Sequence, residues 1–296
     1  MIGVSAPGPA TSNTGGTPRA ERAGRAVRTG VRIATYNIHK GRGMDGRVRI
    51  ERILRVLREI DADIVALQEV VNHEGRSPEE HQARYLADEL GYFFTVGETR
   101  KHRTGVYGNV TLSRWKPELS RHVDLSILGR EPRGALRTDI RVGDGVLHIF
   151  NVHLGTAVRE RRAQARLIDE RLLKGIDILG QRIVMGDFNE WNHGLVTKTL
   201  SDAFDLTDIV TRLPRLRAYP GLLPLLHLDH IYVDHELRID KARLHRNRLS
   251  LMASDHVALV AEVVFRKPTE RDLKGVVGDD RKGSAGRTDQ GPVPTR

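Results

Sequence analysis

The sequence of 296 residues contains no cysteine. Disulfides, zinc–thiolate sites, iron–sulfur clusters and a cysteine nucleophile are therefore excluded. Any metal ion would have to be bound by carboxylate, amide or imidazole groups, and these ligands favour hard cations such as Mg²⁺ or Mn²⁺. Aromatic residues are also scarce, at 5%. The sequence shows no interleaved basic and aromatic residues of the kind that stack single-stranded nucleic acid.

Long apolar segments are absent as well. No run approaches the roughly 20 residues that a membrane-spanning helix needs. The N-terminal region lacks the apolar stretch of a secretory signal. We therefore expect a cytoplasmic monomer without a transmembrane segment. The formal net charge of +10 favours an anionic substrate, although a solvated basic surface would give the same charge.

Both ends of the chain are rich in small and polar residues. Residues 1–30, which are basic, and residues 268–296 have too little apolar content to offset the entropy of ordering, so we predict disordered tails. Residues 31–267 form the predicted catalytic domain. Its predicted strands are 31–37, 63–67, 92–96, 107–112, 136–141, 146–152, 182–185, 228–233 and 256–265, and its predicted helices are 48–60, 78–90 and 159–173. This mixture predicts an α/β domain with helices packed outside its sheets.

Side chains that can bind metal or phosphate recur where the predicted strands end. They are Asn37, Glu69, Asn151, His153, Asp187, Asn189, Asp229, Asp255 and His256. Each has an ordinary explanation when taken alone, such as a turn residue or a structural histidine. Strand ends in stacked sheets can converge on one rim, however, and chance rarely supplies so many sites in order. The set therefore predicts one functional site.

Six short motifs carry a more specific signal. In chain order they are Tyr36-Asn37, Gln68-Glu69, Asn151-Val152-His153, Gly186-Asp187-Phe188-Asn189, Leu228-Asp229 and Ser254-Asp255-His256. Across residues 31–265 the chain resembles the endonuclease/exonuclease/phosphatase superfamily, which includes deoxyribonuclease I-like nucleases, sphingomyelinases and inositol-polyphosphate 5-phosphatases. The resemblance implies a four-layer α/β/β/α sandwich. In that fold two mixed sheets pack face to face, helices lie outside them, and the site lies at one edge of both sheets.

Three further motifs are narrower. They are Tyr36-Asn37-Ile38-His39-Lys40-Gly41, Arg133-Gly134-Ala135-Leu136 and His153-Leu154-Gly155. Together they resemble a bacterial branch of family hydrolases, some of which are associated with phospholipid synthesis genes.

The resemblance implies hydrolysis of a phosphate ester that depends on Mg²⁺ or Mn²⁺. Glu69 would be the main metal ligand, because a carboxylate suits a hard cation. Asn37 would lie beside it and touch metal or phosphate, and Asp255 would be a further ligand.

The same resemblance assigns the catalytic groups. His256 would be a charged imidazole that bonds a phosphoryl oxygen, with Asp229 holding its other nitrogen. Asp187 would orient and deprotonate the attacking water, and Asn189 would position the phosphate. His153 would donate to a phosphate oxygen or assist the leaving group.

Four more residues are predicted to bind substrate. Arg133 and Arg137 could meet the substrate phosphate, although an ordinary surface ion pair is the alternative explanation. Asn109, within Tyr107-Gly108-Asn109, resembles a recurring family position, and Asn151 belongs to a family motif.

The predicted activity is phosphodiester hydrolysis by in-line attack of an activated water, on a phospholipid or a small soluble ester. The apolar segment Leu222-Leu223-Pro224-Leu225-Leu226 favours a lipid, since it precedes Asp229 and could touch acyl chains, although ordinary packing would also explain it. The basic charge favours the alternative of a DNA or RNA nuclease. The third alternative is a catalytically idle binding module.

Overall fold

The computed structural model describes residues 30–73, 80–102, 105–173, 180–190, 194–212 and 228–265. The chain divides into two units, Met1–Val264 and Phe265–Arg296, and the second contributes only Phe265 to the described residues. The predicted tails, apart from Gly30, and the apolar segment 222–226 lie outside the described residues. They stay predictions.

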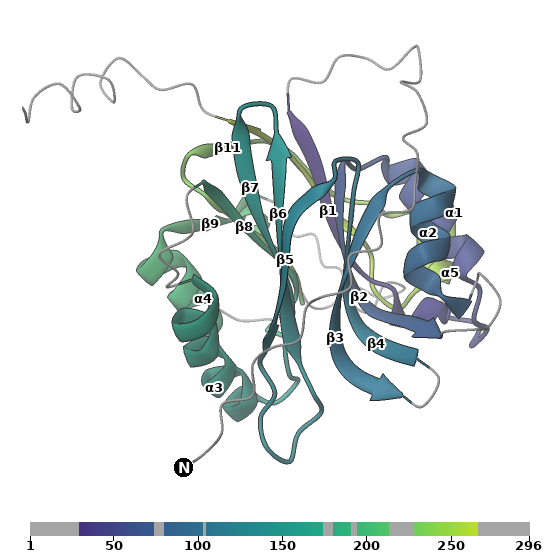
Figure 1. Cartoon of the computed structure of the whole chain (residues 1–296), viewed down its shortest axis with the longest axis horizontal. Helices are drawn as coiled ribbons and strands as arrows, with labels where there is room; N and C mark the ends of the chain where they lie inside the picture. Colours follow the sequence, from purple (N-terminus) through teal and green to yellow (C-terminus); the bar gives the residue numbers. More distant parts are fainter. Residues whose placement is uncertain are drawn as a thin grey trace, which may run out of the picture. The chain divides into compact units, whose positions relative to one another are not determined.

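The described strands form two mixed sheets of six strands each (Figure 1). The first has the order β11-β12-β1-β2-β4-β3 and contains β1 (Val31–Asn37), β2 (Ile64–His73), β3 (Phe93–His102), β4 (Gly105–Ser113), β11 (Leu237–Leu244) and β12 (Leu259–Phe265). The second has the order β5-β6-β7-β8-β10-β9 and contains β5 (Pro117–Asp124), β6 (Gly134–Val142), β7 (Gly145–His153), β8 (Gln181–Asp187), β9 (Leu206–Asp208) and β10 (Asp229–Asp234). Each sheet includes one parallel pair, β1 with β2 and β7 with β8.

Helices cover the outer face of each sheet. The first sheet packs against α1 (Ile50–Ile60), α2 (Gln82–Leu90) and α5 (Arg248–Ala253), and the second against α3 (Val158–Ile168) and α4 (Leu195–Lys198). Short turns complete the described elements, namely η1 (His39–Gly41), η3 (Asp169–Leu173), η4 (Thr199–Ala203) and η5 (Ile209–Arg212). Figure 1 shows α1, α2 and α5 beside one sheet and α3 and α4 beside the other. The predicted α/β/β/α sandwich is confirmed.

The apolar periodicity of α1 explains its packing. Ile53, Leu57 and Ile60 repeat at helical spacing and are buried in the core between this helix and the first sheet. Burying such a side chain contributes roughly 1.5–3 kcal/mol. The helix ends at Asp61, whose left-handed φ of 50° and N–H bond to Leu57 O close the last turn. None of the helices in the described segments is long and apolar enough to cross a membrane.

Strand pairing brings the polar motifs to one edge of the sandwich. In the first sheet Asn37 pairs with Gln68 at the carboxyl end of β1, where the parallel pairing with β2 stops. In the second, His153 pairs with Asp187 at the carboxyl ends of two parallel strands. Asp229 begins the antiparallel neighbour β10 and also pairs with Asp187. The sheets therefore bring residues far apart in sequence to a common rim.

Candidate active site

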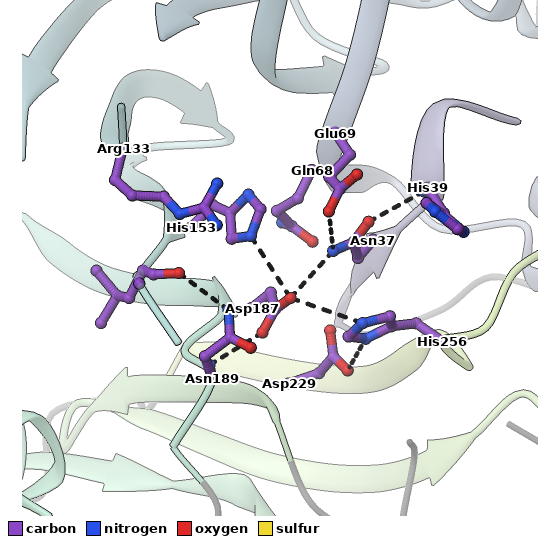
Figure 2. Close-up of polar contacts among 12 residues, drawn as sticks. Asn37, His39, Gln68, Glu69, Arg133, His153, Asp187, Asn189, Asp229 and His256 are labelled. Carbon is purple, nitrogen blue, oxygen red and sulfur yellow. Dashed lines mark hydrogen bonds and ion pairs between the residues drawn. The ribbon is translucent and has the colours of Figure 1, made fainter. Parts of the chain in front are cut away.

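The carboxylate of Asp187 lies at the centre of the polar cluster at this rim (Figure 2). Its Oδ2 accepts a hydrogen bond of 3.0 Å from Asn37 Nδ2 and lies 3.7 Å from Nε2 of both His153 and His256. Its Oδ1 accepts the backbone N–H of Asn189 at 3.0 Å. Asp187 is only 2% exposed. Groups from both sheets therefore converge on one buried carboxylate.

The local sequence Gly-Asp-Phe-Asn fixes this carboxylate by its backbone. Gly186 has a φ of 156°, and a Cβ atom there would lie 1.8 Å from the carbonyl oxygen of Val152, so only glycine fits. Phe188 anchors the turn in the core. Asn189 adopts a left-handed φ of 50°, and its Nδ2 donates to Leu154 O at 2.9 Å. The turn that holds Asp187 is thus tied to the end of the neighbouring strand.

His256 is held against Asp229 as a charged imidazole. Its Nδ1 lies 2.8 Å from Asp229 Oδ2, and both residues are buried. Burial lowers the pKa of His256, but the charges of Asp229 and Asp187 outweigh this effect and raise the pKa to about 10. Oδ1 of Asp229 has no hydrogen-bond partner among the described residues. The pair therefore presents a fixed imidazolium to Asp187 at neutral pH.

His153 lies on another side of Asp187 and, unlike His256, is neutral. Burial lowers the pKa of His153 to about 3, although the charge of Asp187 opposes the shift. The guanidinium of Arg133 lies beside the ring in Figure 2 and favours the neutral imidazole further. Arg133 itself is buried and pairs with Glu131 Oε2 at 2.9 Å. Asp187 therefore lies between a neutral and a charged histidine.

Glu69 occupies a strained position at the end of the parallel pair. Its φ is 58°, and the pairing of β2 with β4 shifts register between Leu67 and Val70. A bulge of this kind redirects a side chain and recurs at functional sites. The Glu69 carboxylate has Oε1 at 3.4 Å from Asn37 Nδ2 and Oε2 at 3.6 Å from Lys40 Nζ. The bulge thus directs a half-buried carboxylate toward the Asp187 cluster.

The donor set around Glu69 fits a magnesium ion with few protein ligands. No three His, Asp or Glu side chains in the described ranges are grouped closely enough to hold a metal. Mg²⁺ is commonly bound by one or two carboxylates, with water and substrate phosphate completing its shell. The Glu69 carboxylate, at the rim of the polar cluster, fits that pattern.

Two predicted metal ligands are placed differently. Asp255 Oδ1 faces His39 Nδ1 at 3.4 Å and accepts from Ser254 Oγ at 3.3 Å. Asn37 directs its NH₂ group at the carboxylates, while its Oδ1 accepts the backbone N–H of His39 at 3.0 Å. An NH₂ group cannot ligate a cation. In this structure Asn37 links Glu69 to Asp187, and the Asp255 carboxylate pairs with His39.

Asn109 and Asn151 join the two sheets beneath the site. Asn151 Nδ2 donates to two backbone carbonyls of the first sheet, at 3.0 and 2.9 Å, and its Oδ1 accepts from Gln68 Nε2 at 2.9 Å. Asn109 Nδ2 donates to Asn151 O at 3.1 Å and to a second carbonyl at 3.0 Å. Both side chains are buried. These bonds hold both side chains between the sheets, where they order the strands beneath the site, and their predicted contact with substrate stays a prediction.

Arg137 lies on the opposite face of its strand from the site. Its guanidinium forms two bonds to Asp139, of 2.9 and 2.8 Å, and lies 3.5 Å from His148 Nδ1. It also stacks 6.0 Å above the centroid of Phe150, a residue of the core beneath α3. Strand alternation therefore directs Arg137 away from the rim, and its predicted contact with substrate stays a prediction that this placement does not support.

Lys40 and Tyr107 belong to the site environment but were not predicted. Lys40 Nζ lies 3.6 Å from Glu69 Oε2 and 5.5 Å from the centroid of the Tyr107 ring. Burial raises the pKa of Tyr107, and the nearby Glu69 carboxylate raises it further, so the hydroxyl stays neutral. The one sequence signal for Lys40 is its place in the motif that begins at Tyr36.

Comparisons with known proteins agree with this architecture. Residues 34–256 match the Endonuclease/Exonuclease/phosphatase family. The chain is 32% identical over 251 residues to the Escherichia coli K12 protein named "Uncharacterized protein YbhP", a match that covers 78% of this chain and 95% of that protein.

Two solved structures share the fold at low identity. An endonuclease/exonuclease/phosphatase from Bacteroides vulgatus has a TM-score of 0.67 and 20% identity, covering 81% of this chain and 100% of that chain. The mannosyl-6-phosphatase of Bacteroides thetaiotaomicron VPI-5482 has a TM-score of 0.65 and 18% identity, covering 79% and 100%. Together with the family match, they extend the likeness over most of the chain. This protein therefore belongs to the Endonuclease/Exonuclease/phosphatase family, whose members are phosphoesterases and nucleases.

Proposed function

We propose that this protein is a divalent-metal-dependent phosphodiesterase that hydrolyses a phospholipid or a small soluble phosphodiester by in-line attack of water. One observation carries the proposal. The buried Asp187 carboxylate contacts Asn37 and lies 3.7 Å from both His153 and His256. A carboxylate between two imidazoles can accept a proton from the attacking water, while the imidazoles offset negative charge on the phosphate.

Glu69 is the group that would hold the cation. Bound Mg²⁺ or Mn²⁺ would supply positive charge for the phosphoryl and leaving oxygens. The strained φ of 58° at Glu69 supports this role, because such a conformation persists where the surrounding structure enforces it.

Asp187 is the proposed base for the attacking water. Its Oδ1 is oriented by the backbone N–H of Asn189, so the side chain cannot rotate freely. Asn37 donates to Oδ2, so hydrogen bonds hold both oxygens of this carboxylate in place. The Asn189 side chain would position the phosphate beside this base.

The two histidines would contact the phosphate in different protonation states. His256 is charged because Asp229 and Asp187 raise its pKa to about 10, so its imidazolium would offset phosphoryl charge. His153 is neutral, with a pKa lowered by burial to about 3, so it can offer one N–H to a phosphate oxygen. Arg133, beside His153, would contribute a further positive charge.

Nuclease activity is the second candidate, because the formal net charge of +10 favours a polyanion. A panel of substrates separates the two. We expect Mg²⁺-dependent hydrolysis of bis-p-nitrophenyl phosphate, and faster turnover of phosphatidylglycerol vesicles or glycerophosphodiesters than of plasmid DNA or inositol phosphates. Salt-sensitive nicking of plasmid DNA with no turnover of the esters would favour the nuclease. A metal-loaded protein that hydrolyses nothing in the panel would instead be a binding module.

A further inference from the structure

A pocket of about 440 Å³ lies next to the candidate active site. It is formed by η1, the first turn of α1, the end of β2 and the start of α2. Lys40 lines this pocket, and its Nζ also lies 3.6 Å from Glu69 Oε2. No residue given a role in the proposed reaction lines the pocket. It is therefore a separate space that shares one wall with the proposed metal site.

Hydrogen bonds fix the floor of this pocket. The buried Gln82 side chain donates from Nε2 to Lys40 O at 2.8 Å and accepts the backbone N–H of Val71 at Oε1, at 3.0 Å. Arg49 N donates to Gly41 O at 2.8 Å. Lys40 and Gly41 adopt left-handed φ values of 60° and 73°. A strained segment held by these bonds indicates a preformed pocket.

The charged side chains at the pocket carry a small positive excess. The cationic groups of Lys40, Arg42 and Arg49 line it together with the carboxylates of Glu51 and Glu80 and the imidazole of His73, and Lys40 also pairs with Glu69. Arg42 and Arg49 are exposed, and Lys40 is half exposed. Cationic groups around a concave surface attract anions to it. Arginine in particular recognises phosphate through paired N–H groups.

Apolar atoms form most of the pocket surface. Val48, Ile50 and Val71 line the pocket and offer contact to carbon atoms rather than to charge. The volume lies within the range of small-molecule sites, about 300–1,000 Å³. A free inorganic anion would leave these apolar atoms without a partner.

We propose that this pocket binds a second phosphate group of the substrate, joined by a short carbon skeleton to the phosphodiester that is cleaved beside Glu69. The inference rests on the proposed function and narrows its substrate class. The substrate would be a small bisphosphorylated ester, built on glycerol or on a nucleoside.

The kinetic test compares two p-nitrophenyl phosphodiesters of glycerol, one with a second phosphate and one without. Arg49→Gln and Arg42→Gln should each raise KM for the first about tenfold, the effect of losing a charge-assisted bond to phosphate, and leave kcat unchanged. KM for the second ester should not change. Arg58→Gln is the matched control, since it removes the same charge from the last turn of α1, where Arg58 pairs with Glu89. Equal KM changes for both esters, or none, would overturn the inference.

A binding measurement tests the pocket assignment without enzymatic turnover. Calorimetry on the full chain without metal should detect binding of glycerol bisphosphate or thymidine bisphosphate, and the Arg42→Gln/Arg49→Gln double variant should abolish it. The bisphosphate that binds more tightly identifies the skeleton. Absence of binding to the wild-type chain, or equal binding by the double variant, would refute the pocket assignment even if the enzyme is active. Failure to hydrolyse any ester would refute the proposed function. The binding test would still show whether the pocket binds a bisphosphate.

Discussion

Asn37 of the first sheet donates a hydrogen bond of 3.0 Å from Nδ2 to Oδ2 of Asp187 in the second sheet. The same NH₂ group lies 3.4 Å from Glu69 Oε1. One amide thus lies between two carboxylates that would otherwise repel each other. The site forms only when both sheets pack together, so the same contacts that stabilise the sandwich also position its chemistry.

Replacing Glu69 by glutamine tests the proposed metal ligand. The amide keeps the size of the side chain but removes the anionic oxygen that a hard cation prefers. We expect turnover to fall by several orders of magnitude, and half-saturation to require at least about tenfold more Mg²⁺. Activity measured across a Mg²⁺ titration checks this, with Glu118→Gln as control because Glu118 is exposed and pairs with Arg141. An unchanged Mg²⁺ titration curve in Glu69→Gln would contradict the assignment of Glu69 as the metal ligand.

Asp229→Asn should change how activity depends on pH. In the wild-type protein the carboxylates of Asp229 and Asp187 raise the pKa of His256 to about 10 despite its burial. Without the Asp229 charge, burial should bring that pKa down toward or below its usual value of about 6.5. The variant should therefore lose kcat/KM as the pH rises through neutrality, where the wild-type protein keeps its imidazolium. Superimposable pH profiles would mean that the charge of His256 is not needed.

Asn151→Leu separates a structural role from substrate binding. Leucine has a similar size but leaves two backbone carbonyls and Gln68 without their bonds at the buried sheet interface. Each unsatisfied group costs about 1–3 kcal/mol, so we expect the free energy of unfolding to fall by about 3 kcal/mol in urea titrations. The folded fraction should keep its KM. A raised KM with full stability would show that Asn151 contacts the substrate.

A buried ion pair should make stability depend on pH. His230 Nδ1 lies 2.8 Å from Asp208 Oδ2. Burial lowers the pKa of His230, but the bond and charge of Asp208 outweigh this effect and raise the pKa to about 9.

Because this value exceeds the unfolded pKa of about 6.5, the stabilisation is complete below pH 6.5 and is lost as the pH rises through 9. Relative to His230→Gln, the wild-type protein should lose about 3 kcal/mol over that interval in urea titrations. His235→Gln, at an exposed position, is the control. A constant difference between wild type and His230→Gln would contradict the pairing.

The inner strands were predictable from the sequence, whereas three of the four edge strands were missed; the fourth, β3, was predicted as 92–96. The strands that the sequence did not predict, β5, β9 and β11, all lie at sheet edges. Strands β5 and β11 mix polar with apolar residues and are partly exposed, and β9 has only three residues, so no continuous apolar run marks them. Helix α5, with six residues, is too short for a recognisable apolar stripe.

The motifs predicted which residues gather at the site, but the sequence did not predict the direction in which each side chain points. His153 and Asp187 lie at strand ends, as the pattern predicted, whereas Glu69 lies at the bulge within β2, which extends beyond the predicted strand 63–67. The face of a strand on which Arg137 lies depends on register, which a single sequence specifies weakly. Lys40 was missed because nothing in its side chain indicates the left-handed backbone that turns it toward Glu69.

The most direct test is the rate at which Asp187→Asn hydrolyses bis-p-nitrophenyl phosphate with saturating Mg²⁺. The amide keeps the shape of the side chain but cannot accept a proton, so kcat should fall by about a thousandfold or more while circular dichroism shows a folded protein. A folded Asp187→Asn protein with a kcat within about tenfold of the wild-type value would contradict the central role given to this carboxylate.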